Sequence, residues 1–448
     1  MLDLTWPPDL LTEDDRARLA RYEEAAAFFA GEQWTRSRKP GETRLTLNYA
    51  RALLRKVASY VFPAEPRFSV PIEGDQQVAN RAERALAETI ARNGLAQLDI
   101  ELCIAAAVRG DAAVKVSWDA RNHGAVVAAV DPATLVVEVA PDDPRRIVEI
   151  VQCYGLHGRQ IAALFDAVPL HLDPRRRYQI VERWNDERWS VTVAGQRLRD
   201  EPNPYGWIPY VILTNHPSLT GFWGESDLAD LYDVCRELNR RMSVLSQVLE
   251  LSGAPIAVLE NVDGSEGVTV GPGAKWELPE GSRAYLLDLL GNGGISLHID
   301  YISQLFRALH DLSETPRTAF GDSGRTISGA ALEVEIQPLI QKVARKRRQW
   351  DAFYQERNRR LLDLLERFGG EPLGGLRRTL TIWPNVLPSD SELAVRSAVA
   401  LVENGIQSRR TALATLGNDD PDTELDRIAT EAERFGTSHS EAPTAQRS

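Results

Sequence analysis

Apolar residues recur in alternating steps of three and four along residues 228–249, and this heptad-like stripe constrains the fold more than any other feature. It predicts an amphipathic helix over about residues 226–251, with Ser226 as its N-cap and Gly253 at its end. At 1.5 Å per residue such a helix is about 39 Å long. The stripe consists of Leu228, Leu231, Cys235, Leu238, Met242, Leu245 and Leu249.

The same rhythm returns in residues 297–313, where Ile302, Leu305 and Leu309 form the apolar face. The residues between the two helices, 254–296, favour a few short strands. Two amphipathic helices that bracket a small insert pack antiparallel, as a helical hairpin with an elaborated tip. We expect the stripes to form a seam between helices or between subunits. A helix that only packs on its own domain's core shows the same pattern, and the sequence leaves both open.

The first 225 residues predict a mixed α+β body. Helical patterns come first, and the period changes to two after Asp111. The turn Asn122-His123-Gly124 between two apolar runs predicts a β-hairpin. Prolines at 202, 204 and 209 predict a loop before the last strand. The helices are expected at about 12–31, 46–61, 75–94 and 96–109, and further strands at 134–139, 146–154, 177–184, 188–194 and 210–213.

Residues 315–327 are rich in Gly, Ser and Thr and predict a mobile, non-helical loop. A long helix follows to Phe368, with a kink expected at Pro338. Beyond a glycine-rich linker, the sequence predicts a strand at 379–383 and helices at 390–404, 408–416 and 421–434. The tail 436–448 has the composition of a disordered segment.

The chain has 448 residues and a net charge of −12, which argues against general, tight DNA binding. The three cysteines are far apart, so neither a disulfide framework nor a zinc site is encoded, and a reducing compartment is expected. No stretch has the length of a signal peptide's apolar region or of a membrane span, so no membrane partner is expected.

Motifs that carry catalytic or cofactor chemistry are missing from the sequence. It holds no phosphate-binding loop of the GxxxxGK[ST] type, no HExxH, no GxSxG and no EF-hand loop. The seven histidines are scattered, without the spacing of metal ligands. We therefore expect no enzyme, no cofactor and no metal site.

Residues 200–260 resemble the portal proteins of tailed bacteriophages, and most closely the siphophage-type portal family. The family pattern G-x-x-P-x-V-x-x-x-N, then F-x-G-x-S-D-L, a helical Asn and a later A-P, is matched by Gly206, Pro209, Val211, Asn215, Phe222, Gly224, Ser226, Asp227, Leu228, Asn239, Ala254 and Pro255. Three looser matches follow the family's order: YEEAAAFFAGEQW near the N-terminus, SGAALEVEIQPLIQKVARK at 328–346 and PNVLPSD…DPDTELDRIATE at 384–431.

This resemblance implies the α+β portal fold, with a mixed α/β wing, a two-helix stem, a small β-containing clip, a long kinked helix and a helical crown, in a ring-forming oligomer. The implied boundaries are wing 1–225, first stem helix 226–252, clip 253–296, second stem helix 297–314, tunnel loop 315–327, long wing helix and return strand 328–383, crown 384–435 and disordered tail 436–448.

The resemblance also implies a function. Portal proteins form a ring, typically of twelve subunits, at one capsid vertex of the virion, and double-stranded DNA passes through it during packaging and ejection. Expected partners are other copies of the chain, DNA, the large terminase that drives packaging, head-completion or tail adaptors, and scaffold or major capsid protein. An acidic channel suits this task, because repulsion keeps the duplex from adhering. Assembly in the host cytoplasm is expected.

Three groups of residues are candidates for this function. The stem stripes form the first. The tunnel-loop residues Arg317, Phe320, Asp322, Ser323 and Arg325 are expected to line the narrowest part of a channel, with an exposed loop at the wing rim as the alternative. The third is a basic cluster that contacts DNA or a neighbouring subunit, or forms a solvated face: Lys342, Arg345, Lys346, Arg347 and Arg348.

Two other functions remain open at this point. One is another capsid-associated ring or adaptor, although adaptors are usually far shorter and lack such a helical hairpin. The other is a metal-dependent nucleic-acid enzyme that uses scattered carboxylates. A ring without cleavage activity would favour the portal, and a small oligomer with Mg²⁺-dependent cleavage would favour the enzyme.

Overall fold

A computed structural model gives the structure of the chain. It describes residues 6–72, 74–165, 171–219, 221–253, 257–261, 280–286, 294–321, 329–387, 391–416, 418 and 421–435. The chain forms two compact units. The first consists of Met1–Val61 and Phe68–Thr381, and the second of Phe62–Arg67 and Ile382–Ser448. The first unit contains helices and antiparallel strands that follow one another in runs, which agrees with the α+β class.

Four long helices open the first unit, after a 3₁₀ turn at Pro8–Leu10. The first of the four helices begins with a capping box, in which Thr12 and Asp15 exchange hydrogen bonds. It ends at Gly31, whose φ of 108° suits a residue without a Cβ. The sequence predicted all four within three residues at each end. They are α1 (Glu13–Ala30), α2 (Tyr49–Val61), α3 (Gln76–Arg92) and α4 (Leu95–Arg109).

A three-stranded antiparallel sheet follows, in the order β3-β2-β9. β2 (Asp111–Asp119) and β3 (Gly124–Val130) form the predicted hairpin, with Val114 opposite Ala129. β9 (Tyr210–Thr214) pairs with the other edge of β2, so the end of α4 and the end of β9 meet at Asp111.

A second, five-stranded sheet is an antiparallel meander in the order β4-β5-β6-β7-β8. The short helix α5 (Gly158–Leu164) contributes Ile161 to the apolar cluster on one face. The sequence missed β8, because its residues are polar and mostly exposed, with no apolar alternation to mark a strand. The strands are β4 (Leu135–Ala140), β5 (Asp143–His157), β6 (Arg177–Trp184), β7 (Arg188–Val193) and β8 (Gln196–Pro202).

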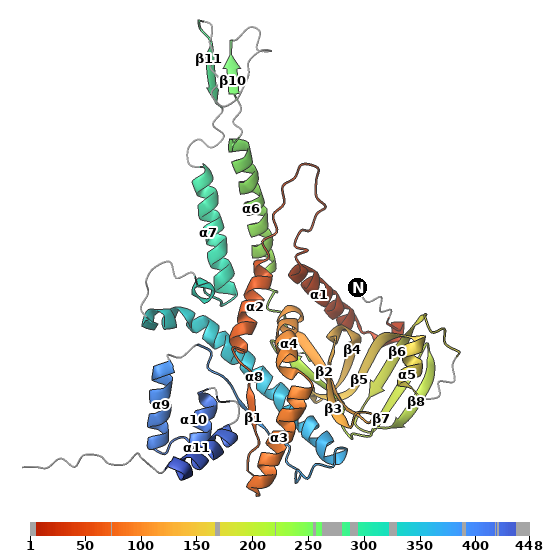
Figure 1. Cartoon of the computed structure of the whole chain (residues 1–448). Coiled ribbons are helices and arrows are strands. Elements are labelled where there is room, and N and C mark those ends of the chain that lie inside the picture. The colour runs from red at the N-terminus through yellow and green to blue at the C-terminus, as the bar shows by residue number, and fades with distance from the viewer. Residues whose placement is uncertain are drawn as a thin grey trace, which may run out of the picture. The chain divides into compact units, whose positions relative to one another are not determined.

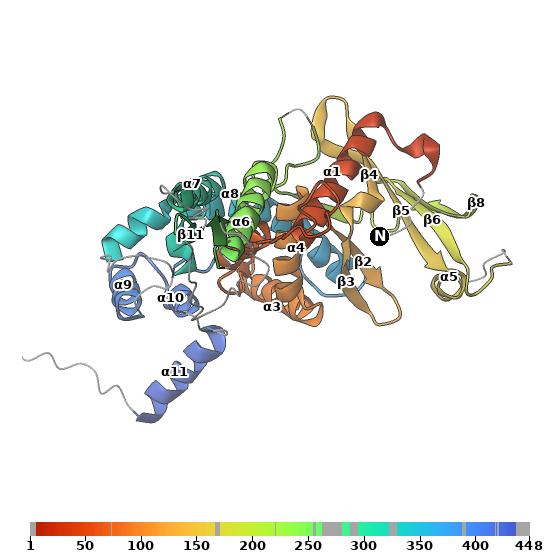
Figure 2. The ribbon, with the colours of Figure 1, turned by 90° about the horizontal axis from the view of Figure 1, so that it is seen from above.

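Two antiparallel helices, α6 (Tyr232–Gly253) and α7 (Gly294–Leu312), form the predicted helical hairpin. They lie side by side in both views (Figure 1, Figure 2). Beyond their free ends, β10 (Ala257–Glu260) pairs antiparallel with β11 (Arg283–Leu286), as Figure 1 shows.

The start of α6 corrects the prediction. Ser226 is not the N-cap of this helix. Its hydroxyl accepts a hydrogen bond from the amide of Leu228, but residues 227–231 form turns and the helix begins only at Tyr232. The amide of Asp227 bonds to the carbonyl of Ala107, so the chain is held against the end of α4 before it can enter a helix.

The remaining part of the first unit is dominated by α8 (Gly329–Arg367), a 39-residue helix that continues through Pro338. It contacts α2, α3 and the three-stranded sheet. A 3₁₀ turn, η5 (Arg317–Phe320), precedes it. β1 (Arg67–Ser69) and β12 (Leu380–Ile382) form a two-stranded sheet.

The second unit holds three helices among its described residues, close to the predicted positions. They are α9 (Ser391–Glu403), α10 (Arg409–Thr415) and α11 (Pro421–Phe435). The predicted disordered tail, 436–448, lies outside the described residues. Throughout the described chain, no helix combines the length and apolar character needed to cross a membrane.

Candidate functional site

The predicted stripe becomes the inner face of the helical hairpin at its base. Leu228, Leu231, Cys235 and Leu238 are fully buried, and they share one apolar cluster with residues of α1, α2 and α4. Ile302 and Leu309 of α7 belong to the same cluster, with Leu305, Met242 and Leu245 packed against it. At this level the stripe is therefore a helix–helix seam that continues into the core of its own subunit.

The free end of the hairpin is different. Leu249, the last residue of the predicted stripe, is 51% exposed. On α7, Leu297 is 73% exposed, and Ile299 and Tyr301 are exposed as well. The apolar stripe thus continues past the core that buries its first half.

A buried carboxylate, Asp227, lies directly before α6 and gathers polar groups from three other segments. Lys346 of α8 approaches its Oδ2 at 2.7 Å, and Nε2 of His216 lies 2.6 Å from its Oδ1. Asn215 donates to Oδ1 at 3.3 Å and accepts from Lys346. Lys342, one helical turn before Lys346, lies 3.7 Å from Oδ1 and donates to the carbonyl of Ser313 just after α7. This cluster joins the start of α6, the end of α7 and α8.

Electrostatics decide the protonation state of this cluster. Burial alone raises the pKa of Asp227, but Lys346, the hydrogen bond from His216, and Lys342 together hold that pKa well below its usual range. Burial lowers the pKa of Lys342, and Asp227 opposes that shift. The carboxylate is therefore charged at neutral pH, and removing it would leave two buried lysines without their counter-charge.

The strand-to-helix segment before Asp227 is fastened to the junction of α4 and β2. The amide of Asn215 bonds to the carbonyl of Gly110, and the amide of Gly224 donates to the buried carboxylate of Asp111 at 2.9 Å. The hydroxyl of Tyr22 donates to the same carboxylate. Gly110 and Gly224 approach so closely that a Cβ on Gly110 would lie 2.5 Å from the carbonyl oxygen of Gly224.

Several of the positions that carry the family resemblance meet here. The hydroxyl of Ser226 and the backbone amides of Asn215, Gly224 and Asp227 bind this junction, and the side chains of Asn215 and Asp227 meet at Lys346. Asn239 of α6 accepts a hydrogen bond from the amide of Leu47 and donates to Gln33. The pattern therefore describes how the base of the hairpin is attached to the rest of its unit.

The basic cluster of α8 is largely used inside the subunit, which corrects the expectation of DNA contact, intersubunit contact or a solvated face for most of it. Lys342 and Lys346 are buried around Asp227. Arg347 donates to the carbonyl of Val61, and Arg345 pairs with Glu314. Of these five cations, only Arg348 is exposed and forms no hydrogen bond or ion pair with another described residue. A run of cations predicted a surface, but the helical period turns every fourth one inward.

The predicted tunnel loop begins with an ordered turn instead of a flexible segment. Residues Arg317–Phe320 form η5, which ends at Gly321 with a φ of 85°. Phe320 is part-exposed, with the ring of His310 at 6.1 Å and the ammonium group of Lys56 at 5.3 Å. Arg317 is exposed. Asp322, Ser323 and Arg325 lie outside the described residues.

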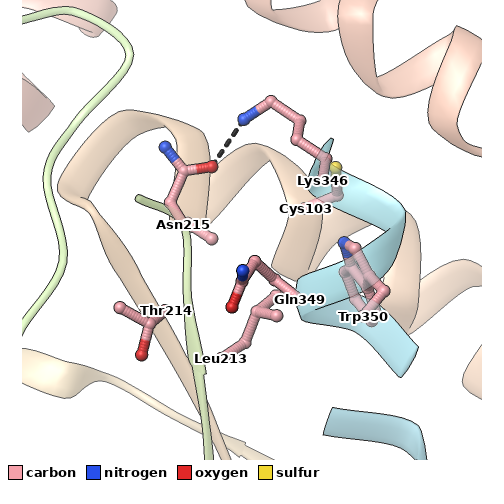
Figure 3. Close-up of a pocket in the computed structure, with 8 residues that line it drawn as sticks. Cys103, Leu213, Thr214, Asn215, Lys346, Gln349 and Trp350 are labelled. Carbon is pink, nitrogen blue, oxygen red and sulfur yellow. Dashed lines mark hydrogen bonds between the residues drawn. The ribbon is translucent and has the colours of Figure 1, made fainter. Parts of the chain in front are cut away.

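A small pocket lies beside the buried cluster, where α4, β9 and α8 meet (Figure 3). Lys346 reaches from α8 to Asn215 across its wall, and Cys103 and Trp350 are part of the lining (Figure 3). Among the residues that the structure describes, no group of three or more His, Cys, Asp or Glu side chains could hold a metal ion.

Comparison with known proteins agrees with this geometry. A family model described as "Phage portal protein, SPP1 Gp6-like" matches residues 9–436, nearly the whole chain. The chain belongs to this family of phage portal proteins. Membership implies self-assembly, association with capsid and packaging components, and a place in the virion capsid; the family is structural, not catalytic. No curated protein gives a significant match to the portal chain.

Two features of this portal protein were not found from its sequence. The role of Asp227 was missed, although a charged residue directly before an amphipathic helix could have suggested it. The basic, irregular segment 31–48 was also overlooked, although its run of Arg and Lys in an acidic chain is visible in the sequence.

Proposed function

We propose that this portal protein forms a ring, of about twelve subunits, at one capsid vertex of a phage. The ring is a channel for double-stranded DNA during packaging and ejection, and a platform for the large terminase and the head-completion or tail adaptor. Scaffold or major capsid protein surrounds it. In this proposal the subunit is assembled in the host cytoplasm and has no enzymatic activity.

One observation carries the proposal most strongly: a helical hairpin with a β-hairpin beyond it, attached by its base to an α+β body, within a chain that matches the family over residues 9–436. In this assignment α6 and α7 are the stem, and β10 and β11 belong to the clip. The first-unit residues up to 225 are the wing, with α8 and the β12 strand. Helices α9, α10 and α11 are the crown.

The segment 315–327 is the proposed tunnel loop. Arg317 and Phe320 stand at its ordered beginning, and Asp322, Ser323 and Arg325 complete it. In support of this, η5 follows α7 directly and precedes α8, so the segment connects the second stem helix with the long helix of the wing. A cysteine placed at Ser323 would crosslink to a neighbouring copy or to packaged DNA if the loop faces a channel.

The direct test is to purify the chain and measure its mass by mass photometry, with negative-stain microscopy of the same sample. The expected result is a closed ring near twelve times the subunit mass of 49.8 kDa. A monomer or dimer at all concentrations up to those used for microscopy would refute the proposal, and so would Mg²⁺-dependent cleavage of DNA by a small oligomer.

A further inference from the structure

The segment between α1 and α2, residues 31–48, is a long irregular loop in the part of the chain that the structure describes. Residues 31–48 contain four Lys or Arg and two Asp or Glu, whereas the whole chain carries a net charge of −12. Irregular loops longer than about 12–15 residues are uncommon in compact domains and usually serve a function. This loop concentrates positive charge in an otherwise acidic protein.

Hydrogen bonds to α6 hold the loop in place. The amide of Leu45 donates to the hydroxyl of Ser243 at 2.9 Å, and the amide of Leu47 donates to Asn239 at 2.8 Å. Arg44 folds back onto the loop, where it donates to the carbonyls of Arg36 and Ser37 and covers the ring of Trp34. The loop therefore keeps one shape before any partner arrives, which lowers the ordering cost of binding.

Three cations point outward from this fixed loop. Arg36, Arg38 and Lys39 are all exposed. The side chain of Arg38 donates a hydrogen bond to the carbonyl of Glu42. Among the described residues, the side chains of Arg36 and Lys39 donate no hydrogen bond. Figure 1 shows the loop rising alongside α6, on the side away from α7.

The complementary surface is the outward face of α7. Asp300, Gln304, Arg307 and Asp311 are exposed at steps of four, three and four residues, so two carboxylates and one arginine lie along one side of the helix. Leu297, three residues before Asp300, is 73% exposed. Tyr301 is exposed as well, although the guanidinium of Arg241 on α6 lies over one face of its ring. Large apolar side chains beside carboxylates, on a helix with no partner on that side among the described residues, are typical of an interface with another protein chain.

We infer that the basic loop 31–48 of one subunit binds the outward face of α7 in the next subunit of the ring. This inference rests on the proposed ring and identifies two surfaces through which neighbouring subunits of that ring bind each other. A head-to-tail ring needs two different, complementary surfaces on each subunit, and the loop and α7 lie on different sides of α6 (Figure 1). A second copy is favoured over nucleic acid because the receiving face is partly apolar as well as acidic. Opposite charges fix the register of such contacts.

The test uses charge reversal in the full-length chain. The variant R36E/R38E/K39E should need at least a ten-fold higher protein concentration for half-maximal ring assembly by mass photometry, and the loss should shrink as salt is raised. The matched control is R145E/R146E/R197E, which reverses three exposed arginines on the five-stranded sheet. It should assemble like the unaltered chain.

The reciprocal variant, D300R/D311R, changes only exposed residues of α7 and should weaken assembly to a similar degree. Combining it with R36E/R38E/K39E should restore at least half of the lost assembly, since the charges then match again across the contact. Circular dichroism melts of each variant should stay at the temperature of the unaltered chain, which excludes unfolding as the cause.

The outcomes separate this inference from the proposed function. If the unaltered chain forms no ring, the proposed function fails. If the unaltered chain forms rings and R36E/R38E/K39E forms them equally well, the inference is wrong and the ring proposal stands. Normal rings that no longer retard a double-stranded DNA fragment in a gel would assign the loop to nucleic acid, which also overturns the inference. Weakened assembly in both variants without rescue in the combination would place the two surfaces in separate contacts and overturn it as well.

Discussion

The helical hairpin has a base and a tip that obey the same sequence pattern but have different surroundings. The base comprises residues 214–245 and 302–315, and the tip comprises residues 246–301. At the base, Leu238 is 0% exposed and packs into a cluster shared with α1, α2 and α4. At the tip, the stripe ends at Leu249, which is half exposed, and faces no such core.

This difference in burial determines which apolar side chains stabilise the single subunit. Apolar burial of the kind seen at the base contributes about 25 cal/mol per Å² to the stability of the single subunit. The exposed leucines of the tip contribute little to the subunit, but they would contribute once a neighbouring copy covered them. One repeating pattern is thus covered by the core at the base of the hairpin and left exposed at its tip.

The largest expected contrast is between Leu238→Asp and Leu249→Asp. Leu238→Asp places a carboxylate among buried apolar side chains and should lower the free energy of unfolding by at least about 4 kcal/mol. Leu249→Asp should change it by less than about 0.5 kcal/mol, because the side chain is already half solvated. Urea unfolding followed by tryptophan fluorescence measures both. Equal stability of the two variants would contradict the division into base and tip.

The second contrast compares two variants: one removes a buried charge at the base, and the other removes an exposed charge nearby. Asp227→Asn leaves Lys342 and Lys346 buried without a counter-charge and should cost about 3–5 kcal/mol of subunit stability. The control, Glu314→Gln, breaks the solvent-exposed pair with Arg345 and removes a more distant charge that also favours the ammonium of Lys342; it should cost at most about 1 kcal/mol. If Asp227→Asn is as mild as the control, then Asp227 does not hold the hairpin to α8.

Much of this could be predicted from sequence, for a physical reason. Periodic apolar residues report burial locally, so the hairpin, α1 to α4 and the β2-β3 turn were found close to their observed bounds. Turn and cap residues also act locally. The start of α6 was placed six residues too early, because the hydrogen bond that delays the helix comes from Ala107, far away in the sequence.

The candidate site was less predictable. Lys342 and Lys346 belong to a run of cations whose composition indicates a surface, and only the distant carboxylate of Asp227 explains why two of them are buried. Strand β8 has no apolar face that would mark it in the sequence, and it forms because its backbone pairs with β7. Long-range partners of polar groups leave no periodic trace in a single sequence.

A third contrast compares two glycines that both have a left-handed backbone. Gly110→Ala at the base puts a Cβ 2.5 Å from the carbonyl oxygen of Gly224, in addition to the strain of a φ of 103°. Gly281→Ala at the tip has a φ of 86° but nothing within 4 Å. The tip variant should cost about 1 kcal/mol, and the base variant about 2 kcal/mol more. Thermal melts of the purified variants test the order, and a reversed order would show that the segment before Asp227 can move away from Gly110 at little cost.

The smallest expected effect is a pH dependence of the free energy of unfolding that arises from Asp111 at the base. Its sign is the reverse of the usual one for a carboxylate, because the folded chain holds the proton more tightly than the unfolded chain does. The fully buried Asp111 accepts hydrogen bonds from Tyr22 and from the amide of Gly224, yet burial raises its pKa to about 6. Between about pH 4 and 6 the folded chain therefore binds a proton at Asp111 that the unfolded chain releases. The free energy of unfolding should fall as the pH rises through this window.

Asp227 has the opposite sign. Its pKa is held well below the usual range, so its contribution to stability is present at neutral pH and is lost as the pH falls below about 4. Asp111→Asn keeps an acceptor for the amide of Gly224 and removes the ionisation; its amide group faces the hydroxyl of Tyr22, which would then accept a hydrogen bond instead of donating one. That exchange changes the stability by an amount that does not depend on pH in this range. We expect the variant to gain about 1–3 kcal/mol over the unaltered chain on going from pH 4 to pH 7, while both lose stability below pH 4. Urea midpoints at half-unit pH steps measure this difference. A gap between the two proteins that stays constant from pH 4 to 7 would mean that Asp111 remains ionised in the folded subunit, and that the attachment of Gly224 at the base is a charged contact.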